Sequence, residues 1–202
     1  MSEVKSDFLK QNSKKIFTSI PSGRYKGKKL LLPSLQSTRS TKNIVCSCVF
    51  NVLRQNLRDK IFIEAFGGSA LMAATALSNY ALKAYAIELD KKAYHIALKN
   101  AKALDENLHI LNGDSFELLP KLLKQIDALA VLYFDPPFDI RKGFEGIYER
   151  IYTLLNQLDS SKISALILEH HKDLQTPQFL NEFKRIKLKK FGLTSLSFYE
   201  KF

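Results

Sequence analysis

The sequence contains only two cysteines, Cys46 and Cys48. Two residues apart on a helix, their side chains point to different faces, so we expect no disulfide between them. Two thiols are also too few for a structural zinc site, and we expect no metal site. A chain with so few cysteines fits a reducing, cytoplasmic environment.

Long apolar runs are absent as well. No stretch of the 202 residues approaches the roughly 18 consecutive apolar residues that a membrane helix needs. The first 15 residues are polar and lack the apolar centre of a signal peptide. We therefore expect no association with a membrane. Hydrophobic residues still make up 46% of the chain, which is enough for a substantial core.

Acidic residues are scarce in the first part of the chain. Residues 1–60 hold 13 Lys and Arg but 3 Asp and Glu, a balance of +10. Residues 61–202 hold 18 and 17, a balance of +1. A basic arm on a nearly neutral body indicates a polyanionic partner such as a nucleic acid, although a merely solvated surface has the same composition.

Short apolar runs alternate with helical patterns over most of the body. Such alternation predicts an α/β protein with a parallel sheet covered on both faces. Two further strands, 183–191 and 194–202, are predicted to close the sheet as an antiparallel hairpin, after a helix near 176–182. The apolar runs predicted to be parallel strands are 60–66, 83–89, 108–114, 128–135 and 163–170.

The basic N-terminal part has a different pattern. Residues 17–33 are predicted to form a hairpin around Gly23 and Gly27, and residues 40–57 a helix. We therefore divide the chain into an N-terminal extension, residues 1–58, that binds RNA, and a second domain, residues 59–202.

Polar groups follow the predicted parallel strands, where ligands bind in such sheets. Gly67, Gly68 and Ser69 form a tight turn before a helix, which allows a ligand to approach backbone amides. Glu88 follows 20 residues after Gly68, the spacing at which a carboxylate meets a ribose. Asp114 ends the third strand. Each acid alone is more often a helix cap, but together they predict a nucleoside site.

The glycine pattern indicates which nucleoside is bound. A dinucleotide fold shows G-x-G-x-x-G, whereas the letters here are Gly68, Ala70 and Ala73. A cofactor without phosphates does not need this pattern. S-adenosylmethionine, an adenosine with a sulfonium and an amino-acid tail, fits the residues.

The tetrad DPPF, residues 135–138, ends the fourth strand stiffly because proline donates no backbone hydrogen bond. A carboxylate and a carbonyl aimed at the two protons of an exocyclic amine favour its attack on a methyl group. We assign these roles to Asp135 and to the carbonyl of Pro136, with Phe138 as a face on which a base stacks. The tetrad could also be a simple strand stop without chemistry.

These motifs resemble the RsmD family of bacterial methyltransferases. SGRYKGKKLLLP, residues 22–33, is similar to the family's opening GG-x-(W/Y)-(R/K)-G-(R/K)-x-L-x-x-P, and TRSTKNIVCSCVFNVL, residues 38–53, is similar to LRPTTDRVRETLFNWL. EAFGGSALMAATALSNYA corresponds to DLFAGSGALGLEALSRGA, and YFDPPF to FLDPPF. The resemblance runs over residues 19 to 200.

The resemblance implies a class I S-adenosylmethionine-dependent methyltransferase fold, Rossmann-like, with a small basic N-terminal extension. It implies methylation of the exocyclic N2 of guanine 966 in 16S ribosomal RNA, within an assembling small subunit or free. We expect a monomer. The implied cofactor residues are Glu64, Phe66, Gly68, Ser69, Glu88, Leu89, Asp114, Ser115 and Asp135, and the implied RNA-binding residues are Arg24, Lys26, Lys28, Lys29, Arg39 and Lys42.

Some positions depart from the family pattern. Glu64 replaces an aspartate, Ala70 and Ala73 replace glycines, and Ile44 and Cys46 stand where arginines are usual. Three other functions therefore stay open: an adenine-N6 methyltransferase acting on DNA, a catalytically inactive RNA-binding relative, and a nicotinamide dehydrogenase. The last lacks both the full glycine pattern and a convincing catalytic histidine.

Overall fold

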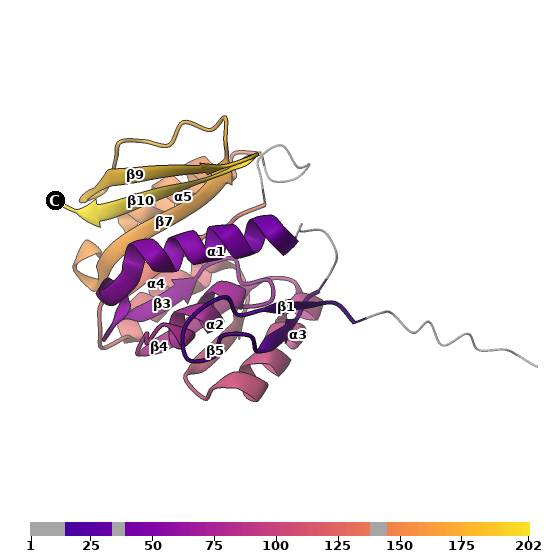
Figure 1. Ribbon diagram of the computed structural model, residues 1–202. Helices are drawn as coiled ribbons and strands as arrows, with labels where there is room; N and C mark the ends of the chain where they lie inside the picture. Colours follow the sequence, from indigo (N-terminus) through magenta and orange to yellow (C-terminus); the bar gives the residue numbers. More distant parts are fainter. Residues whose placement is uncertain (1–14, 34–38, 138–144) are drawn as a thin grey trace, which may run out of the picture.

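A computed structural model of the chain describes residues 15–33, 39–137 and 145–202. Its centre is an eight-stranded sheet with the strand order β5-β4-β3-β6-β7-β10-β9-β8 (Figure 1). The first five of these strands in that order pair in parallel, and β10 pairs antiparallel with both β7 and β9. The strands are β3 (Ile61–Glu64), β4 (Lys83–Glu88), β5 (Leu108–Asn112), β6 (Ala130–Phe134), β7 (Ile163–His171), β8 (Phe179–Leu180), β9 (Phe183–Phe191) and β10 (Thr194–Lys201).

Helices cover both faces of this sheet. Successive side chains of a strand point to opposite faces, so Phe62 and Val131 join the core under α1, α2 and α3, whereas Ile63 and Leu132 join the core under α4 and α5. Burial on both faces explains why the parallel strands are continuous apolar runs. The helices are α1 (Arg39–Leu53), α2 (Leu71–Ser78), α3 (Lys91–Leu104), α4 (Ser115–Gln125) and α5 (Ile147–Gln157), with 3-10 turns η1 (Arg54–Leu57) and η2 (Ser160–Lys162).

The N-terminal hairpin is a separate two-stranded sheet of β1 (Phe17–Ser19) and β2 (Lys29–Leu31). The buried side chain of Asn100 on α3 ties it to the body. Asn100 Oδ1 accepts from the Leu31 amide at 2.8 Å, and Nδ2 donates to the carbonyls of Leu31 and Ser69, both at 3.0 Å. The hairpin is thereby connected to the glycine turn of the predicted nucleoside site.

The predicted fold class is confirmed, with one correction to its details. The helix predicted near 176–182 is wrong: β8 lies there instead. Pro177 has no amide to donate, and the Arg185 guanidinium donates to the Thr176 carbonyl at 2.6 Å, which holds the segment extended. α4 contains Pro120 and continues through it. Cys46 and Cys48 are both free, as expected.

Candidate functional site

The candidate site lies at the carboxyl ends of the parallel strands. The strand order reverses at β3, which has β4 on one side and β6 on the other. Ligands of open α/β sheets bind at such a switch point. Glu64 ends β3, Glu88 ends β4, and Asp135 directly follows β6. The topology therefore brings three predicted site residues, far apart in sequence, to one edge of the sheet.

The glycine turn is held by Glu88. Glu88 Oε2 accepts from the Gly68 amide at 2.6 Å, and Oε1 accepts from the Asp90 amide at 2.7 Å. The Gly67 amide donates to the Ile87 carbonyl at 2.8 Å. Each carboxylate oxygen has a second lone pair, so Glu88 keeps two acceptor positions for the hydroxyls of a ribose.

The space around the turn fits a cofactor. Gly68 has a φ of 51°, and a side chain built on it would meet nothing within 4 Å. The open space therefore begins at the backbone beside the Glu88 carboxylate. Leu89, the next residue, is 68% exposed and offers an apolar face there. A nucleoside that presents a diol to Glu88 fits these residues.

Polar and aromatic contacts join the start of α4 to the end of β3. Asp114 caps this helix, because its Oδ1 accepts from the Phe116 amide at 2.9 Å. The buried Ser115 hydroxyl donates to the Ala65 carbonyl, which joins α4 to the end of β3. The ring of Phe116 lies 6.3 Å from that of Phe66, edge to face. Asp114 is thus a helix cap, and its predicted contact with the adenine stays a prediction.

Sequence analysis missed Arg150 on α5. Its guanidinium lies 4.1 Å above the Phe116 ring, and its Nη2 is 4.0 Å from Asp114 Oδ2. No local motif marks this residue, because its partners come from another helix. Arg150 supplies a positive charge next to the carboxylate predicted to meet the adenine.

The predicted amine clamp follows β6. Asp135 is partly exposed, Pro136 is buried, and Lys42 Nζ lies 3.9 Å from Asp135 Oδ2. Lys42 was predicted to bind RNA phosphate, and the structure places its charge at the clamp. Phe138 lies outside the described residues, as does the side chain of Arg39, so their roles stay predictions.

Two buried carboxyl groups lie under the clamp. The Tyr133 hydroxyl donates to Glu169 Oε2, and Glu64 Oε2 accepts from the Ala73 amide at 2.9 Å. Burial, and then the charge of Asp135, raise the pKa of Glu169 to about 8 against the opposing effects of Tyr133 and Lys42. Glu169 follows the apolar part of β7 as Asp135 follows β6, so the strand-end rule could have found it.

The protonation of Glu64 gives a test of this burial. Burial raises the pKa of Glu64 from its ordinary 4.5 to about 8, more than the Ala73 amide and Lys42 lower it. At a pH between these two pKa values, Glu64 holds a proton in the folded chain that it has released in the unfolded chain. The contribution of Glu64 to stability therefore falls as pH rises. Glutamine does not titrate, so Glu64→Gln loses this fall of stability with rising pH. The unfolding free energy of the variant minus that of the parent should rise by about 1.4 kcal/mol from pH 6 to pH 7.

Urea titrations at both pH values measure this difference. Glu106→Gln, at an exposed position, is the control and should show no such rise. If the difference in unfolding free energy between Glu64→Gln and the parent is the same at pH 6 and pH 7, Glu64 is not protonated in the folded chain.

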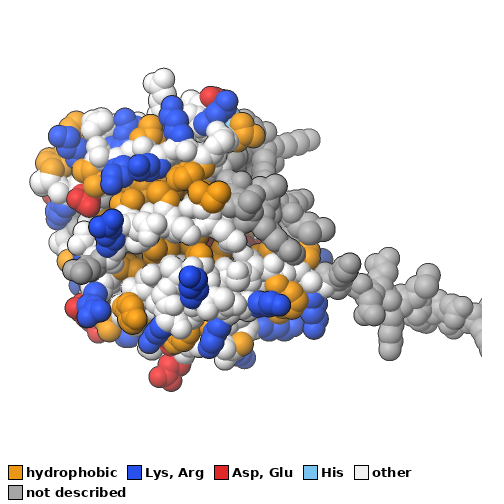
Figure 2. Space-filling view, in the orientation of Figure 1, with side chains coloured by type: hydrophobic (Ala, Val, Ile, Leu, Met, Phe, Trp, Pro, Cys, Tyr) orange, Lys and Arg blue, Asp and Glu red, His pale blue; other side chains and the backbone are white. Residues whose placement is uncertain are grey.

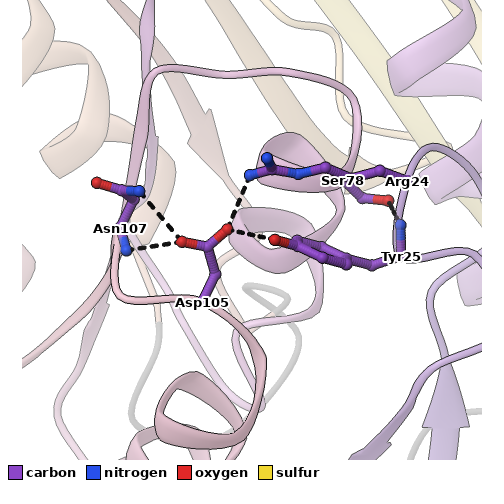
Figure 3. A network of polar contacts seen from close by, with 5 residues as sticks. All are labelled: Arg24, Tyr25, Ser78, Asp105 and Asn107. Atoms are coloured by element: carbon purple, nitrogen blue, oxygen red, sulfur yellow. Dashed lines mark hydrogen bonds and ion pairs between the residues drawn. The ribbon is translucent and has the colours of Figure 1, made fainter.

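The basic hairpin is docked through the network in Figure 3. Asp105 Oδ2 accepts from the Tyr25 hydroxyl at 2.6 Å and pairs with Arg24 Nη2 at 2.7 Å. The Tyr25 amide donates to Ser78 Oγ at 2.8 Å. Gly23 has a φ of 82° and lies so close to Ser78 that a side chain there would meet its carbonyl oxygen at 2.0 Å. Arg24 therefore helps to hold the hairpin rigidly against α2 and α3.

Other site types find little support in the part of the chain that the structure describes. There, no group of three or more His, Cys, Asp or Glu side chains could hold a metal ion. No described helix is long and apolar enough to span a membrane. His170 is buried and its ring nitrogens contact the His171 carbonyl and Ser197 Oγ, both at 2.9 Å. It joins β7 to β10 and lies in the sheet as a structural residue.

Comparisons with known proteins agree with this geometry. The family model described as conserved hypothetical protein 95 matches residues 18–200. Ribosomal RNA small subunit methyltransferase D of Haemophilus influenzae is 28% identical over 187 residues, which cover 90% of this chain and 92% of that protein. The solved structure of yhhF from Escherichia coli has a TM-score of 0.71 at 24% identity and covers 92% of this chain and 98% of that one. SMU.776, solved in complex with SAH, has a TM-score of 0.59 at 13% identity and covers 87% and 52%.

Proposed function

Because the chain belongs to the RsmD family, which its family model describes as conserved hypothetical protein 95, we propose that it is an S-adenosylmethionine-dependent methyltransferase of 16S ribosomal RNA. The observation that carries the proposal is the meeting of the glycine turn, Glu88 and Asp135 at the switch point of the sheet. The Haemophilus influenzae relative is named for the same reaction class. The target that we propose is the exocyclic N2 of guanine 966.

The cofactor is held, in this proposal, by the residues around the glycine turn. Glu88 accepts hydrogen bonds from the ribose, and Gly68 and Ser69 border the methionine end. Asp114 and Ser115 meet the adenine, with Phe66 and Leu89 as apolar neighbours. Glu64 contributes indirectly, because it accepts a hydrogen bond from the Ala73 amide and so holds the start of α2 in place. The structure of SMU.776 with SAH supports a cofactor of this kind on this fold.

When bound, S-adenosylmethionine would supply the methyl group from its sulfonium, whose sulfur–methyl bond would break and leave a neutral thioether. The chain's part is to present the base amine in the attacking geometry. Asp135 and the Pro136 carbonyl accept hydrogen bonds from its two protons, and Phe138 stacks on the base. As the nitrogen–carbon bond forms, the nitrogen loses one proton, for which the Asp135 carboxylate is the nearest acceptor in this arrangement. Catalysis is then mostly positioning and electrostatics.

We also propose that residues 1–58 serve as the RNA-binding extension of a methyltransferase domain, residues 59–202. The docked hairpin supports this division of labour. Lys26, Lys28 and Lys29 are exposed on it, and Lys28 Nζ lies 4.7 Å from the centre of the Tyr25 ring. A rigid hairpin presents these charges in fixed positions, at little entropic cost on binding.

Replacing Lys26, Lys28 and Lys29 together with glutamine should flatten the salt dependence of RNA affinity. The slope of log K against log salt should fall by roughly 0.7–0.9 for each phosphate that the variant no longer binds. Filter binding to 16S ribosomal RNA over a range of salt concentrations measures it. Replacing Lys91 and Lys92 at the start of α3 is the charge-loss control. An unchanged slope in the hairpin variant would show that its charges only solvate the hairpin.

The proposed activity is tested with the purified chain, 16S ribosomal RNA and methyl-labelled S-adenosylmethionine. Label should enter the RNA, and the digested product should contain N2-methylguanosine. Calorimetry should show binding of S-adenosylmethionine and none of a nicotinamide dinucleotide. Label in N6-methyladenine would instead assign the chain to adenine methylation, and cofactor binding without any label in nucleic acid would contradict the proposal.

A further inference from the structure

A groove runs between α1 and the C-terminal strands, outside the site described above. Figure 2 shows this face, with basic side chains over the β9–β10 part of the molecule. The groove has a volume of about 800 Å³. Asn43, Ser47 and Asn51, at helical spacing, form its α1 wall, and Lys187 and Lys189 lie on its β9 wall.

The positive charges in the groove have no ion-pair partner in the described part of the chain. β9 carries five basic residues and no acidic one in nine positions. Lys187 and Lys189 line the groove together with Arg54, and none of the described residues that line it is acidic. No ion pair joins these three cations to any acidic residue of the described chain. Like charges gathered in a concave surface repel one another and attract a polyanion.

Lysines on an exposed strand have a second explanation, which is protection of the sheet edge. β8 pairs with β9 at Phe183 and Lys184, and Gln178 bonds to Arg185, so no strand of the described chain pairs with the outer edge of β9 beyond that residue. Lysines there would discourage pairing with another chain. That role is served equally by lysines on either face of the strand. It gives no reason for Arg54, on a different element, to face the same groove.

The α1 wall of the groove starts one residue after Lys42. Lys42, which lies 3.9 Å from Asp135, immediately precedes Asn43 on α1. Leu53, the last residue of α1, follows ten residues after Asn43, a rise of roughly 15 Å along the helix, and Arg54 comes next in the chain. Phe191, at the other wall, is partly exposed and offers a ring for stacking.

We propose that this groove binds the RNA strand that flanks the target nucleotide. Lys187, Lys189 and Arg54 contact its phosphates, and Phe191 stacks on a base. The inference rests on the proposed function, because that function supplies the RNA. It adds a second contact surface to the N-terminal hairpin.

Two matched pairs of substitutions on one strand test the proposal. Lys187→Gln with Lys189→Gln removes two charges that line the groove. Lys184→Gln with Lys190→Gln removes the same number from the same strand, at positions that do not line it. Affinity of the full chain for 16S ribosomal RNA is measured against salt. In Lys187→Gln with Lys189→Gln, the slope of log K against log salt should fall by roughly 0.7 for each phosphate of a single strand that is no longer bound. In Lys184→Gln with Lys190→Gln, this slope should stay near the parent value.

An equal fall of this slope in the two double variants would overturn the proposal in favour of a general charge effect. An unchanged slope in both would overturn it in favour of edge protection. Calorimetry with S-adenosylmethionine on each variant checks the fold and should match the parent. The proposed function is judged separately, from methyl transfer by the parent: a parent that binds RNA but transfers no methyl group contradicts that function, while the comparison of slopes still decides whether RNA occupies the groove.

Discussion

Methyl transfer in a single turnover is expected to fall by roughly 10²–10³ when Asp135 is replaced by alanine, with cofactor affinity nearly unchanged. Asp135 directly follows β6 at the switch point, partly exposed and 3.9 Å from Lys42. A carboxylate that holds an amine proton acts mainly as charge develops on the nitrogen. Its loss should therefore appear in kcat rather than in substrate binding.

The measurement is the rate of label transfer to RNA at saturating S-adenosylmethionine, with a cofactor titration of each variant. Asp135→Asn keeps the size of the side chain, removes its charge, and should lose most of the rate as well. A normal rate in Asp135→Ala would reduce the proline tetrad to a strand stop. A lost rate accompanied by lost cofactor binding would assign Asp135 to the methionine end of the cofactor instead.

Replacing Glu88 with alanine should weaken S-adenosylmethionine binding by roughly 1–3 kcal/mol, which is about 5-fold to 150-fold. The substitution removes the proposed ribose acceptors. It also frees the Gly68 amide, which donates to Glu88 Oε2 at 2.6 Å, so the glycine turn loses its anchor. Both effects raise the dissociation constant of the cofactor.

Calorimetry measures that constant, and two variants separate the two effects. Glu88→Gln still presents one oxygen to the turn but has fewer acceptors for a diol, so its affinity should lie between those of Glu88→Ala and the parent. Glu106→Ala removes an exposed charge before β5 and should bind as the parent does. Cofactor binding by Glu88→Ala at the parent's affinity would show that the nucleoside lies elsewhere.

The parts of the site that could be predicted from sequence are those defined by strand ends. In a parallel sheet the carboxyl ends meet at one edge, so an acid that follows an apolar run is placed by its local pattern alone. Glu88 and Asp135 were predicted on this ground, and the structure brings the strands that carry them to the switch point. The same rule applied to the strand before His170 would have added Glu169.

The parts that could not be predicted depend on contacts between distant segments. Arg24 and Asp105 are 81 residues apart, and only the docking of the hairpin on α3 pairs them. Lys42 belongs to a basic segment in the sequence, yet the position of α1 over the sheet brings it to Asp135. The wrong helix near 176–182 has a similar cause, because Arg185 on β9 holds the Thr176 carbonyl in an extended segment.

The central claim, that this chain methylates a guanine amine of 16S ribosomal RNA, is tested most directly by nucleoside mass spectrometry of that RNA. The RNA is taken from cells with the protein, from cells without it, and from cells that carry Asp135→Ala in its place. The account predicts that one N2-methylguanosine is present in the first and missing from the other two. An unchanged set of methylated guanines in all three would contradict it.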